Sequence, residues 1–363
     1  MRIAFLTSTP LDFARGSGTF AGIATLAAAV AARGTGVAFF TPSVRMPVYT
    51  LERLWFNRQL RGQDFGRCDV LVGFDMDGWQ VAGLRGLLHV ASIKGVIADE
   101  MRFERGLTRW TMSIQAACER VHVRRADLVL TTSHYAAVRI EELYGVTARI
   151  VPECIDLDGW RDLFRRNPAA PAPGRFTVLC VCRLFPRKRV GVLLDAAAIL
   201  RARLPELEVR IVGRGPEESR LKRRAGAMKL GPAVRWLGDV SQAELAREYR
   251  SCDVFCLPSV QEGFGIVFLE AMAAAKPIVA ARAGAVPEVV AQGLLVEPED
   301  AESLARAIAR LHQDRALGDS LAERGLRVVA QFDAPKVAQA FLAELSAYDP
   351  DRKFRLDAGP DAP

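Results

Sequence analysis

The sequence predicts an α/β protein built from two doubly wound domains, each with a parallel sheet. Short apolar runs, typical of strands buried on both faces, alternate with helical stretches along most of the chain. A Pro/Ala-rich segment at residues 167–175 interrupts this alternation near the middle. The length of 363 residues is also too great for one ordinary hydrophobic core. We therefore expect two Rossmann-like domains that face each other across a cleft.

The first domain is expected to span residues 1–166. It opens with a strand, a glycine-containing loop, a helix that ends at Gly34, and a second strand, which is a typical β-loop-α-β unit. The expected elements are strands at 2–7, 37–41, 68–73, 87–93, 127–132 and 149–152, and helices at 20–33, 105–125 and 134–144.

The second domain is expected to span residues 176–334, after a linker at 167–175. A last helix at 335–348 is expected to pack back toward the first domain, and the polar tail 349–363 to be disordered. The expected elements are strands at 176–182, 208–212, 234–237, 253–257, 277–281 and 293–296, and helices at 190–202, 242–250 and within 301–330.

Ligands of doubly wound sheets bind beyond the carboxyl ends of the strands, so the loops there are candidate sites. Gly16 and Gly18 follow the first strand, either as a tight turn or as a close backbone approach to a phosphate or substrate. Asp75 and Asp77 follow another strand as an Asp-x-Asp pair. They either bind a divalent cation or bond to nearby backbone in a turn.

The segment 258–273 carries the strongest signal for chemistry. An apolar strand leads through a Gly-Phe-Gly loop into an apolar, Ala-rich helix, with Glu262 in the loop and Glu270 inside the helix. The first N–H groups of a helix have no internal partner, and the helix dipole is positive there, so this geometry favours an anion such as a phosphate. A buried carboxylate needs a partner, because burying an unpaired charge is costly. Hydroxyls of a sugar or a ribose are natural partners.

The bulk properties restrict the class of protein. The formal net charge of +7 favours anionic partners, and the hydrophobic and charged fractions of 50% and 25% are typical of a soluble globular chain. The sequence contains no apolar run long enough to cross a bilayer and no signal-peptide pattern, so we expect a cytoplasmic protein. The seven cysteines form no paired framework and are expected to be reduced and mostly buried.

Several segments of the sequence resemble retaining GT-B glycosyltransferases, in particular glycosyltransferase family 4 (glycosyl transferases group 1). Glu262 and Glu270, with seven residues between them, match the family's E-x7-E motif. Arg183 and Lys188 look like its basic pair after the first strand of the second domain. Further likenesses are found at 211–216, 276–280, 284–289 and, more loosely, 151–156.

The resemblance implies transfer of a sugar from a UDP- or GDP-linked donor to an acceptor, with retention at the anomeric carbon and no obligatory metal or other cofactor. Arg183 and Lys188 would hold the diphosphate, and Glu262 would contact sugar hydroxyls. Glu270 would bind the ribose hydroxyls. Further donor contacts would come from Gly263, Phe264, Gly265, Ile266 and Gly213. The acceptor would be a small molecule, a lipid-linked group or a glycan, with peripheral association at the inner membrane face and no nucleic-acid partner.

The acceptor side departs from the family pattern. Many members have a histidine after the strand that here ends at Ile93, and Lys94 stands near that position. Lys94 is either a ligand contact or a surface lysine, and His89 is expected in the core. Gly16-Ser17-Gly18 replaces the adjacent glycines that are common in the family.

Two other classes of function remain open from the sequence. An epimerase or another GT-B-fold enzyme would convert a nucleotide sugar without an acceptor. A non-enzymatic anion- or nucleic-acid-binding protein would use the +7 charge, although the sequence lacks a recognisable nucleic-acid-binding module.

Overall fold

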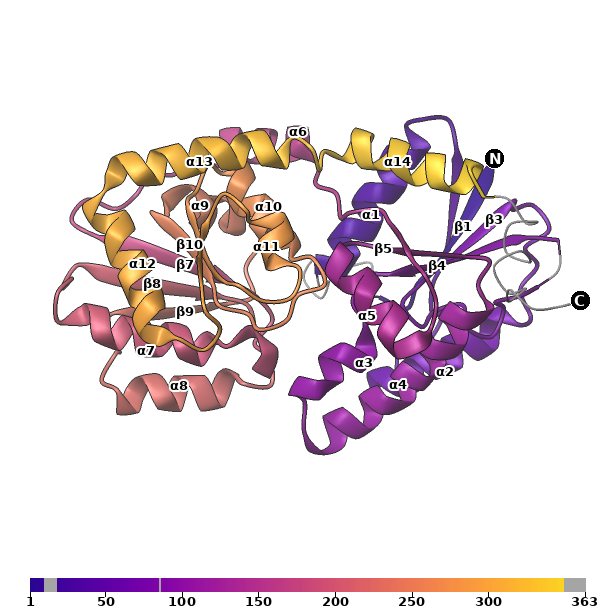
Figure 1. The fold of residues 1–363 in the computed structure, drawn as a ribbon, viewed down its shortest axis with the longest axis horizontal. Helices are drawn as coiled ribbons and strands as arrows, with labels where there is room; N and C mark the ends of the chain where they lie inside the picture. Colours follow the sequence, from indigo (N-terminus) through magenta and orange to yellow (C-terminus); the bar gives the residue numbers. More distant parts are fainter. Residues whose placement is uncertain (10–17, 85, 349–363) are drawn as a thin grey trace, which may run out of the picture. The chain divides into compact units, whose positions relative to one another are not determined.

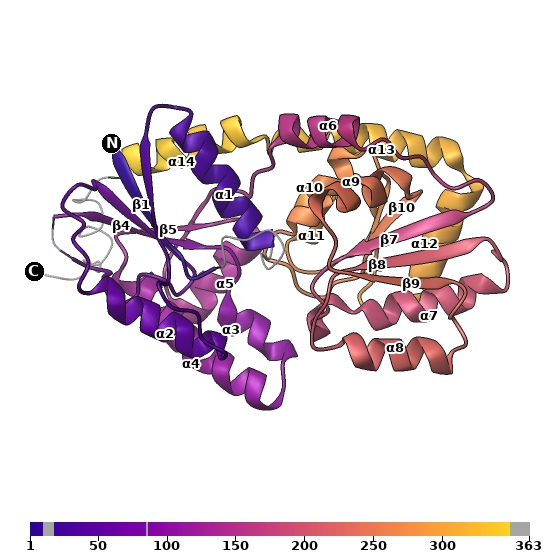
Figure 2. The same ribbon diagram turned by 180° about the vertical axis from the view of Figure 1, so that it is seen from behind.

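The computed structural model describes residues 1–9, 18–84 and 86–348, and it divides the chain into two compact units (Figures 1 and 2). Unit 1 consists of residues 1–10, 23–152 and 335–363, and unit 2 of residues 11–22 and 153–334. Gly16 and the predicted tail at 349–363 lie outside the described residues.

Unit 1 is built on a six-stranded sheet of order β2-β1-β3-β4-β5-β6, with all neighbours parallel. The chain leaves β1 in one direction along the sheet and β3 in the other, so the switch point of this sheet lies between β1 and β3. The strands are β1 (Arg2–Leu6), β2 (Gly36–Phe40), β3 (Val70–Phe74), β4 (Leu88–Ile93), β5 (Leu128–Thr131) and β6 (Arg149–Ile150).

The helices of unit 1 cover this sheet, and the chain returns to the unit at its C-terminal end. Phe341 of the last helix makes an edge contact with Phe5 of β1, at 6.3 Å between ring centroids, and Glu344 pairs with Arg149 at 2.9 Å. The elements are α1 (Gly18–Ala31), α2 (Tyr49–Leu60), α3 (Ile97–Glu100), η1 (Met101–Phe103), α4 (Gly106–Arg125), α5 (His134–Tyr144) and α14 (Ala334–Ser346).

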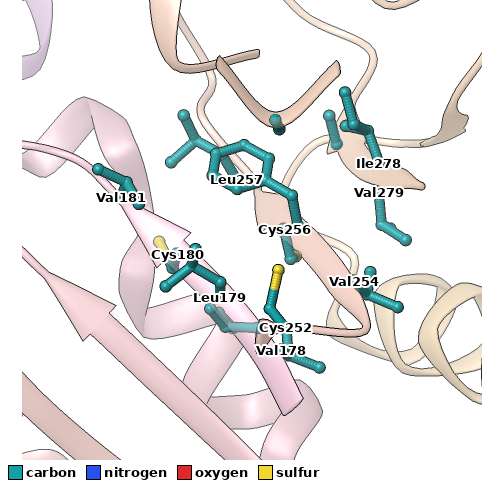
Figure 3. Packing of buried hydrophobic residues seen from close by; sticks show 14 of the residues in the cluster. Val178, Leu179, Cys180, Val181, Cys252, Val254, Cys256, Leu257, Ile278 and Val279 are labelled. Carbon is teal, nitrogen blue, oxygen red and sulfur yellow. The ribbon is translucent and has the colours of Figure 1, made fainter. Parts of the chain in front are cut away.

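Unit 2 is built on a second parallel six-stranded sheet, of order β12-β11-β10-β7-β8-β9. This is the Rossmann strand order, and its switch point lies between β7 and β10. The strands are β7 (Phe176–Val181), β8 (Leu207–Val212), β9 (Val234–Gly238), β10 (Val254–Leu257), β11 (Ile278–Ala281) and β12 (Leu294–Val296). Figure 3 shows the apolar packing between β7, β10 and β11, where Val178, Cys180 and Cys256 are fully buried.

Helices cover both faces of the second sheet. One group is formed by α7 with α8 and α12, and the other by α6, α9, α10 and α13 (Figure 1). The elements are α6 (Leu157–Arg166), η2 (Pro186–Lys188), α7 (Val190–Arg201), α8 (Glu218–Ala227), α9 (Gln242–Ser251), α10 (Ile266–Ala273), α11 (Val286–Val289), α12 (Ala301–Gln313) and α13 (Arg315–Val329).

The division between the units falls at residues 152 and 153, before the linker predicted at 167–175. The reason is α6, which packs on α9 and α10 of unit 2. Trp160 of α6 lies edge-on to Tyr249 of α9, with 5.8 Å between ring centroids. The Pro/Ala segment is therefore a loop within unit 2.

The predicted strands are found with small shifts at their ends, and the prediction of reduced, mostly buried cysteines is confirmed, since all seven are free and six are buried. Helices α2 and α6 were not predicted. No helix in the described part of the chain is both long and apolar enough to span a bilayer.

Candidate active site

The predicted donor residues of unit 2 gather at the switch point of its sheet. Because β7 and β10 are neighbours, the loops after them leave the same edge. One loop carries Arg183 and Lys188, and the other carries Glu262 and the Gly-Phe-Gly turn. A backbone bond from Val260 N to Arg187 O, at 2.9 Å, joins the two loops.

Lys188 and Glu262 form a two-pronged ion pair at this edge. The ammonium nitrogen lies 2.6 Å from Oε1 and 2.7 Å from Oε2 of the carboxylate. The side chains keep only 12% and 7% of their surface exposed, so neither charge is well solvated on its own. An ammonium group has three N–H donors, and the third has no acceptor within the described residues. It is available to an anion that enters the site.

Backbone geometry fixes the loop that carries Glu262. Gly265 caps the start of α10 with a φ of 90°, a left-handed conformation that favours glycine. Gly284 packs so closely that a Cβ atom there would lie 2.7 Å from Glu262 N. Ala285 N then donates to Glu262 O at 3.1 Å. The loop is thus held from both sides, and the start of α10 offers N–H groups to an anion.

Glu270 is buried within α10, on the inner side of this loop. Its Oε2 accepts a hydrogen bond of 2.7 Å from the hydroxyl of Tyr249, a fully buried residue of α9. Burial raises the pKa of the Glu270 carboxyl to about 7, and the bond from Tyr249 opposes this shift. Near neutral pH the group is therefore balanced between its acid and its carboxylate.

Gly213 lies at the end of β8, next to the β7 loop. Its φ is 108°, and a Cβ atom there would lie 2.1 Å from the carbonyl oxygen of Cys182. Close packing of the two strand ends therefore requires glycine. The neighbouring Arg183 is exposed, with its guanidinium carbon 5.7 Å from the Phe185 ring centroid, so its charge is accessible to a ligand.

The start of α1 reaches the same loop-helix. Gly18 belongs to unit 2, and a Cβ atom on it would lie 2.7 Å from the Ile266 side chain. This contact requires a very small residue at position 18. The structure thus places Gly18 beside the first residue of α10, which the sequence did not predict.

The strand ends of unit 1 hold a buried polar network. The carboxylate of Asp77 accepts from the backbone N and the hydroxyl of Ser8, at 2.6 and 2.7 Å, and from Asn57 Nδ2 at 3.1 Å. The carboxylate of Asp75 accepts from Lys94 N at 2.8 Å. Asp75 itself is left-handed, with a φ of 53°, which aspartate tolerates better than most residues.

These bonds tie the ends of β1, β3 and β4 together and support the turn interpretation of the Asp-x-Asp pair. Burial raises the pKa of the Asp75 carboxyl to about 6. The described residues contain no group of three or more His, Cys, Asp or Glu side chains arranged to hold a metal ion. Lys94 is nearly buried, with its ammonium group 5.9 Å from the Phe74 ring centroid.

His89 lies in the core, paired with a second histidine. The Nε2 atoms of His89 and His122 are 2.8 Å apart, and Nδ1 of His122 is 2.5 Å from the carbonyl oxygen of Asp75. A carbonyl can only accept, so His122 donates from Nδ1 and accepts at Nε2 from His89. Burial lowers the pKa of His122 to about 4, so His122 is neutral near pH 7.

The comparisons with known proteins agree with this geometry. Residues 164–328 match the family model described as Glycosyl transferases group 1. A GDP-mannose-dependent alpha-(1-6)-phosphatidylinositol monomannoside mannosyltransferase of Mycobacterium tuberculosis is 34% identical over 209 residues, which cover 52% of this chain and 53% of the relative. A D-inositol 3-phosphate glycosyltransferase 2 of Catenulispora acidiphila is 34% identical, covering 56% of this chain and 53% of the relative. The chain spans about half the length of the curated relatives it matches.

Solved structures extend the likeness to almost the whole chain. A sucrose-phosphate synthase of Thermosynechococcus elongatus has a TM-score of 0.80 at 22% identity, covering 99% of this chain and 100% of that one. Anabaena HepE, solved with UDP and glucose, has a TM-score of 0.72 at 18% identity, covering 95% and 99%. At such identities the likeness establishes the fold, which is that of GT-B glycosyltransferases. Residues 164–328 therefore form a domain of the glycosyl transferases group 1 family, in a chain that has the GT-B fold.

Proposed function

We propose that the chain is a retaining glycosyltransferase that moves a sugar from a UDP- or GDP-linked donor to an acceptor. The observation that carries this proposal is the Lys188–Glu262 pair beside the glycine-capped start of α10, at the switch point of the unit 2 sheet. A diphosphate matches this arrangement in charge, because the ammonium group and the free N–H groups of α10 lie at the same edge of the sheet.

Charge neutralisation of the leaving group is the main task of the site. As the bond between the anomeric carbon and the diphosphate breaks, negative charge develops on the phosphate oxygen. Lys188 supplies its third N–H donor, and Arg183 supplies an accessible guanidinium. Hydrogen bonds between charged groups are worth about 1.5–3 kcal/mol each, so these two residues can supply several kcal/mol. With this positive charge in place, the reaction is expected to need no metal ion.

Glu262 has two roles in this proposal. It holds the Lys188 ammonium group in place, and we expect its carboxylate to accept hydrogen bonds from the sugar hydroxyls of a donor bound at α10. Transfer with retention then proceeds through an oxocarbenium-like transition state, with the acceptor attacking from the face that the diphosphate leaves. Glu270 binds the ribose hydroxyls.

The direct test is a panel of nucleotide sugars. We expect at least one UDP- or GDP-sugar to raise the melting temperature, because a ligand that binds only the folded state stabilises it by mass action. Incubation of that donor alone separates this proposal from an epimerase, which would convert it without an acceptor. Salt-dependent retention on DNA without nucleotide-sugar binding would instead favour an anion-binding protein.

We further propose that the acceptor is carried by a membrane lipid and that the protein docks on an anionic membrane surface. The supporting feature is a set of exposed apolar side chains on α2 and α4, two helices that contact each other. Leu107 and Trp110 of α4 are 74% and 62% exposed, and Leu51 and Trp55 are exposed on α2. The acidic residues of the two helices are buried, whereas the exposed charges are those of the arginines at 58, 109, 120, 124 and 125. Apolar side chains among basic ones suit the interface of an anionic bilayer.

Sedimentation with vesicles tests the docking surface. We expect the protein to bind vesicles that contain phosphatidylinositol and to bind phosphatidylcholine vesicles weakly. A Trp110→Ala, Leu107→Ala double variant should lose most of this binding. Leu326→Ala, which removes an exposed leucine from α13 of unit 2, should bind as the wild type does. Equal binding by wild type and the double variant would contradict this assignment.

A further inference from the structure

We propose that Tyr249 is a positioning residue of the nucleotide site, whose hydroxyl holds the Glu270 carboxylate in the orientation and charge state that bind the ligand's vicinal hydroxyls. This inference rests on the proposed function. Tyr249 belongs to α9, outside both loops of the site, and is fully buried, so it acts through Glu270 and does not touch the ligand.

The geometry fixes the tyrosine on several sides. Its ring packs edge-on against Trp160 of α6 and lies tilted against Phe255 of β10, with 5.8 Å between ring centroids in each case. Its hydroxyl lies 2.7 Å from Glu270 Oε2 and 3.3 Å from the carbonyl oxygen of Val267. With the ring held by two elements, the position of Oε2 is determined.

The other carboxylate oxygen is left for a ligand. Within the described residues, Oε1 of Glu270 accepts no hydrogen bond, and the residue keeps 8% of its surface exposed. A vicinal diol such as that of a ribose offers two O–H donors, which a carboxylate with a free oxygen can accept. One oxygen is thus bound by Tyr249 and one is open.

No cation offsets the charge of Glu270 among the described residues. The inner faces of α6, α13 and β11 are apolar, with Leu157, Trp160 and Phe164 from α6, Leu321, Ala322 and Val329 from α13, and Ile278 to Ala281 from β11. The titratable groups near the pair are Cys252 and Cys180, both buried thiols. The hydrogen bond from Tyr249 is therefore the main contact that stabilises the ionised form.

This arrangement couples nucleotide binding to protonation. Burial raises the pKa of Glu270 to about 7, whereas ligand hydroxyls donate to the carboxylate and favour its ionised form. Affinity should therefore increase as the pH rises through about 7. Loss of the tyrosine hydroxyl should move this transition to higher pH, because the carboxylate then loses its donor.

The test compares the pH profile of UDP and GDP binding in the wild type and in Tyr249→Phe, by calorimetry between about pH 6 and 9. We expect the midpoint to move up by about one to two pH units, with affinity about tenfold or more weaker at neutral pH and recovering at high pH. In turnover, KM for the donor should rise while kcat changes little. Tyr144→Phe is the matched control, since Tyr144 donates to the buried Glu119 in unit 1, and its profile should equal that of the wild type.

A second substitution distinguishes an effect of the hydroxyl from an effect of misfolding. Tyr249→3-fluorotyrosine keeps the shape and makes the hydroxyl a stronger donor, so the midpoint should move down. An unchanged midpoint in both variants, or an equal loss of affinity at every pH, would overturn the positioning role while leaving the proposed function standing. Failure of the wild type to bind any nucleotide would overturn both.

Discussion

Removal of the Lys188 charge is the perturbation that most directly probes the ion pair of unit 2. We consider Lys188→Met, which keeps the aliphatic part of the side chain. The Glu262 carboxylate would lose both of its hydrogen bonds while it is only 7% exposed. Breaking a buried ion pair by removing one partner costs about 3–5 kcal/mol. Because the lysine side chain is 12% exposed and water can enter, we expect a loss of stability of about 3 kcal/mol.

The same change should weaken nucleotide diphosphate binding for a different reason. One charge-assisted hydrogen bond to phosphate is worth about 1.5–3 kcal/mol, which corresponds to about 10- to 150-fold in Kd. The two effects are separated by a Lys188→Met, Glu262→Gln double variant, in which no charge is left unpaired. Its stability should return to within about 1 kcal/mol of the wild type. Its affinity for UDP or GDP should stay as weak as that of the Lys188→Met variant.

Calorimetry supplies both quantities, as the melting temperature of the free protein and as the dissociation constant of the nucleotide. If the double variant regained wild-type affinity together with its stability, Lys188 would be only a structural partner of Glu262. The reasoning that places the diphosphate at this pair would then be wrong.

Further predictions concern both units. Glu270→Ala should abolish sugar transfer and leave the circular dichroism spectrum unchanged, and full activity in this variant would contradict its donor role. Transfer should persist in EDTA, whereas strict dependence on an added metal ion would point back to Asp75 and Asp77. Asp77→Asn should lower stability by about 1–3 kcal/mol in urea unfolding, since the carboxylate of Asp77 accepts from Ser8 and Asn57, and an unchanged midpoint would refute this. His122 should stay neutral by NMR down to about pH 4. Its contribution to stability is then present above about pH 6.5 and is lost as the pH falls toward 4; a normal titration near 6.5 would contradict the buried pair.

The sequence predicted the strands of both sheets, but it did not predict helices α2 and α6. Apolar runs bounded by turn residues located the strands, because strands buried on both faces need continuous hydrophobic residues. Helix α2 was missed because its pattern is inverted. Polar Arg53 and Asn57 face the interior to bind Asp77, and Leu51 and Trp55 face outward. Helix α6 does carry a sequence signal, since Asp156 caps it and Leu157, Trp160 and Phe164 recur at helical spacing.

The sequence predicts which residues are candidates for the site, but it does not predict which of them contact each other. The motif around Glu262 and Glu270 is local in sequence, so it can be read directly. Lys188 and Glu262 bind each other across 74 positions, and this pairing depends on β7 and β10 being neighbours. The role of Tyr249 cannot be predicted from the sequence, because a tyrosine in an amphipathic helix is normally part of the core. Only the structure shows that its hydroxyl donates a hydrogen bond to Glu270.

The stereochemistry of transfer tests the central proposal most directly. A donor selected from the nucleotide-sugar panel is incubated in EDTA with an inositol phospholipid or another acceptor that it glycosylates, and the product is analysed by NMR. We predict that the new glycosidic bond has the same anomeric configuration as the donor. Inversion of that configuration, or the absence of both binding and transfer for every UDP- and GDP-sugar, would contradict it.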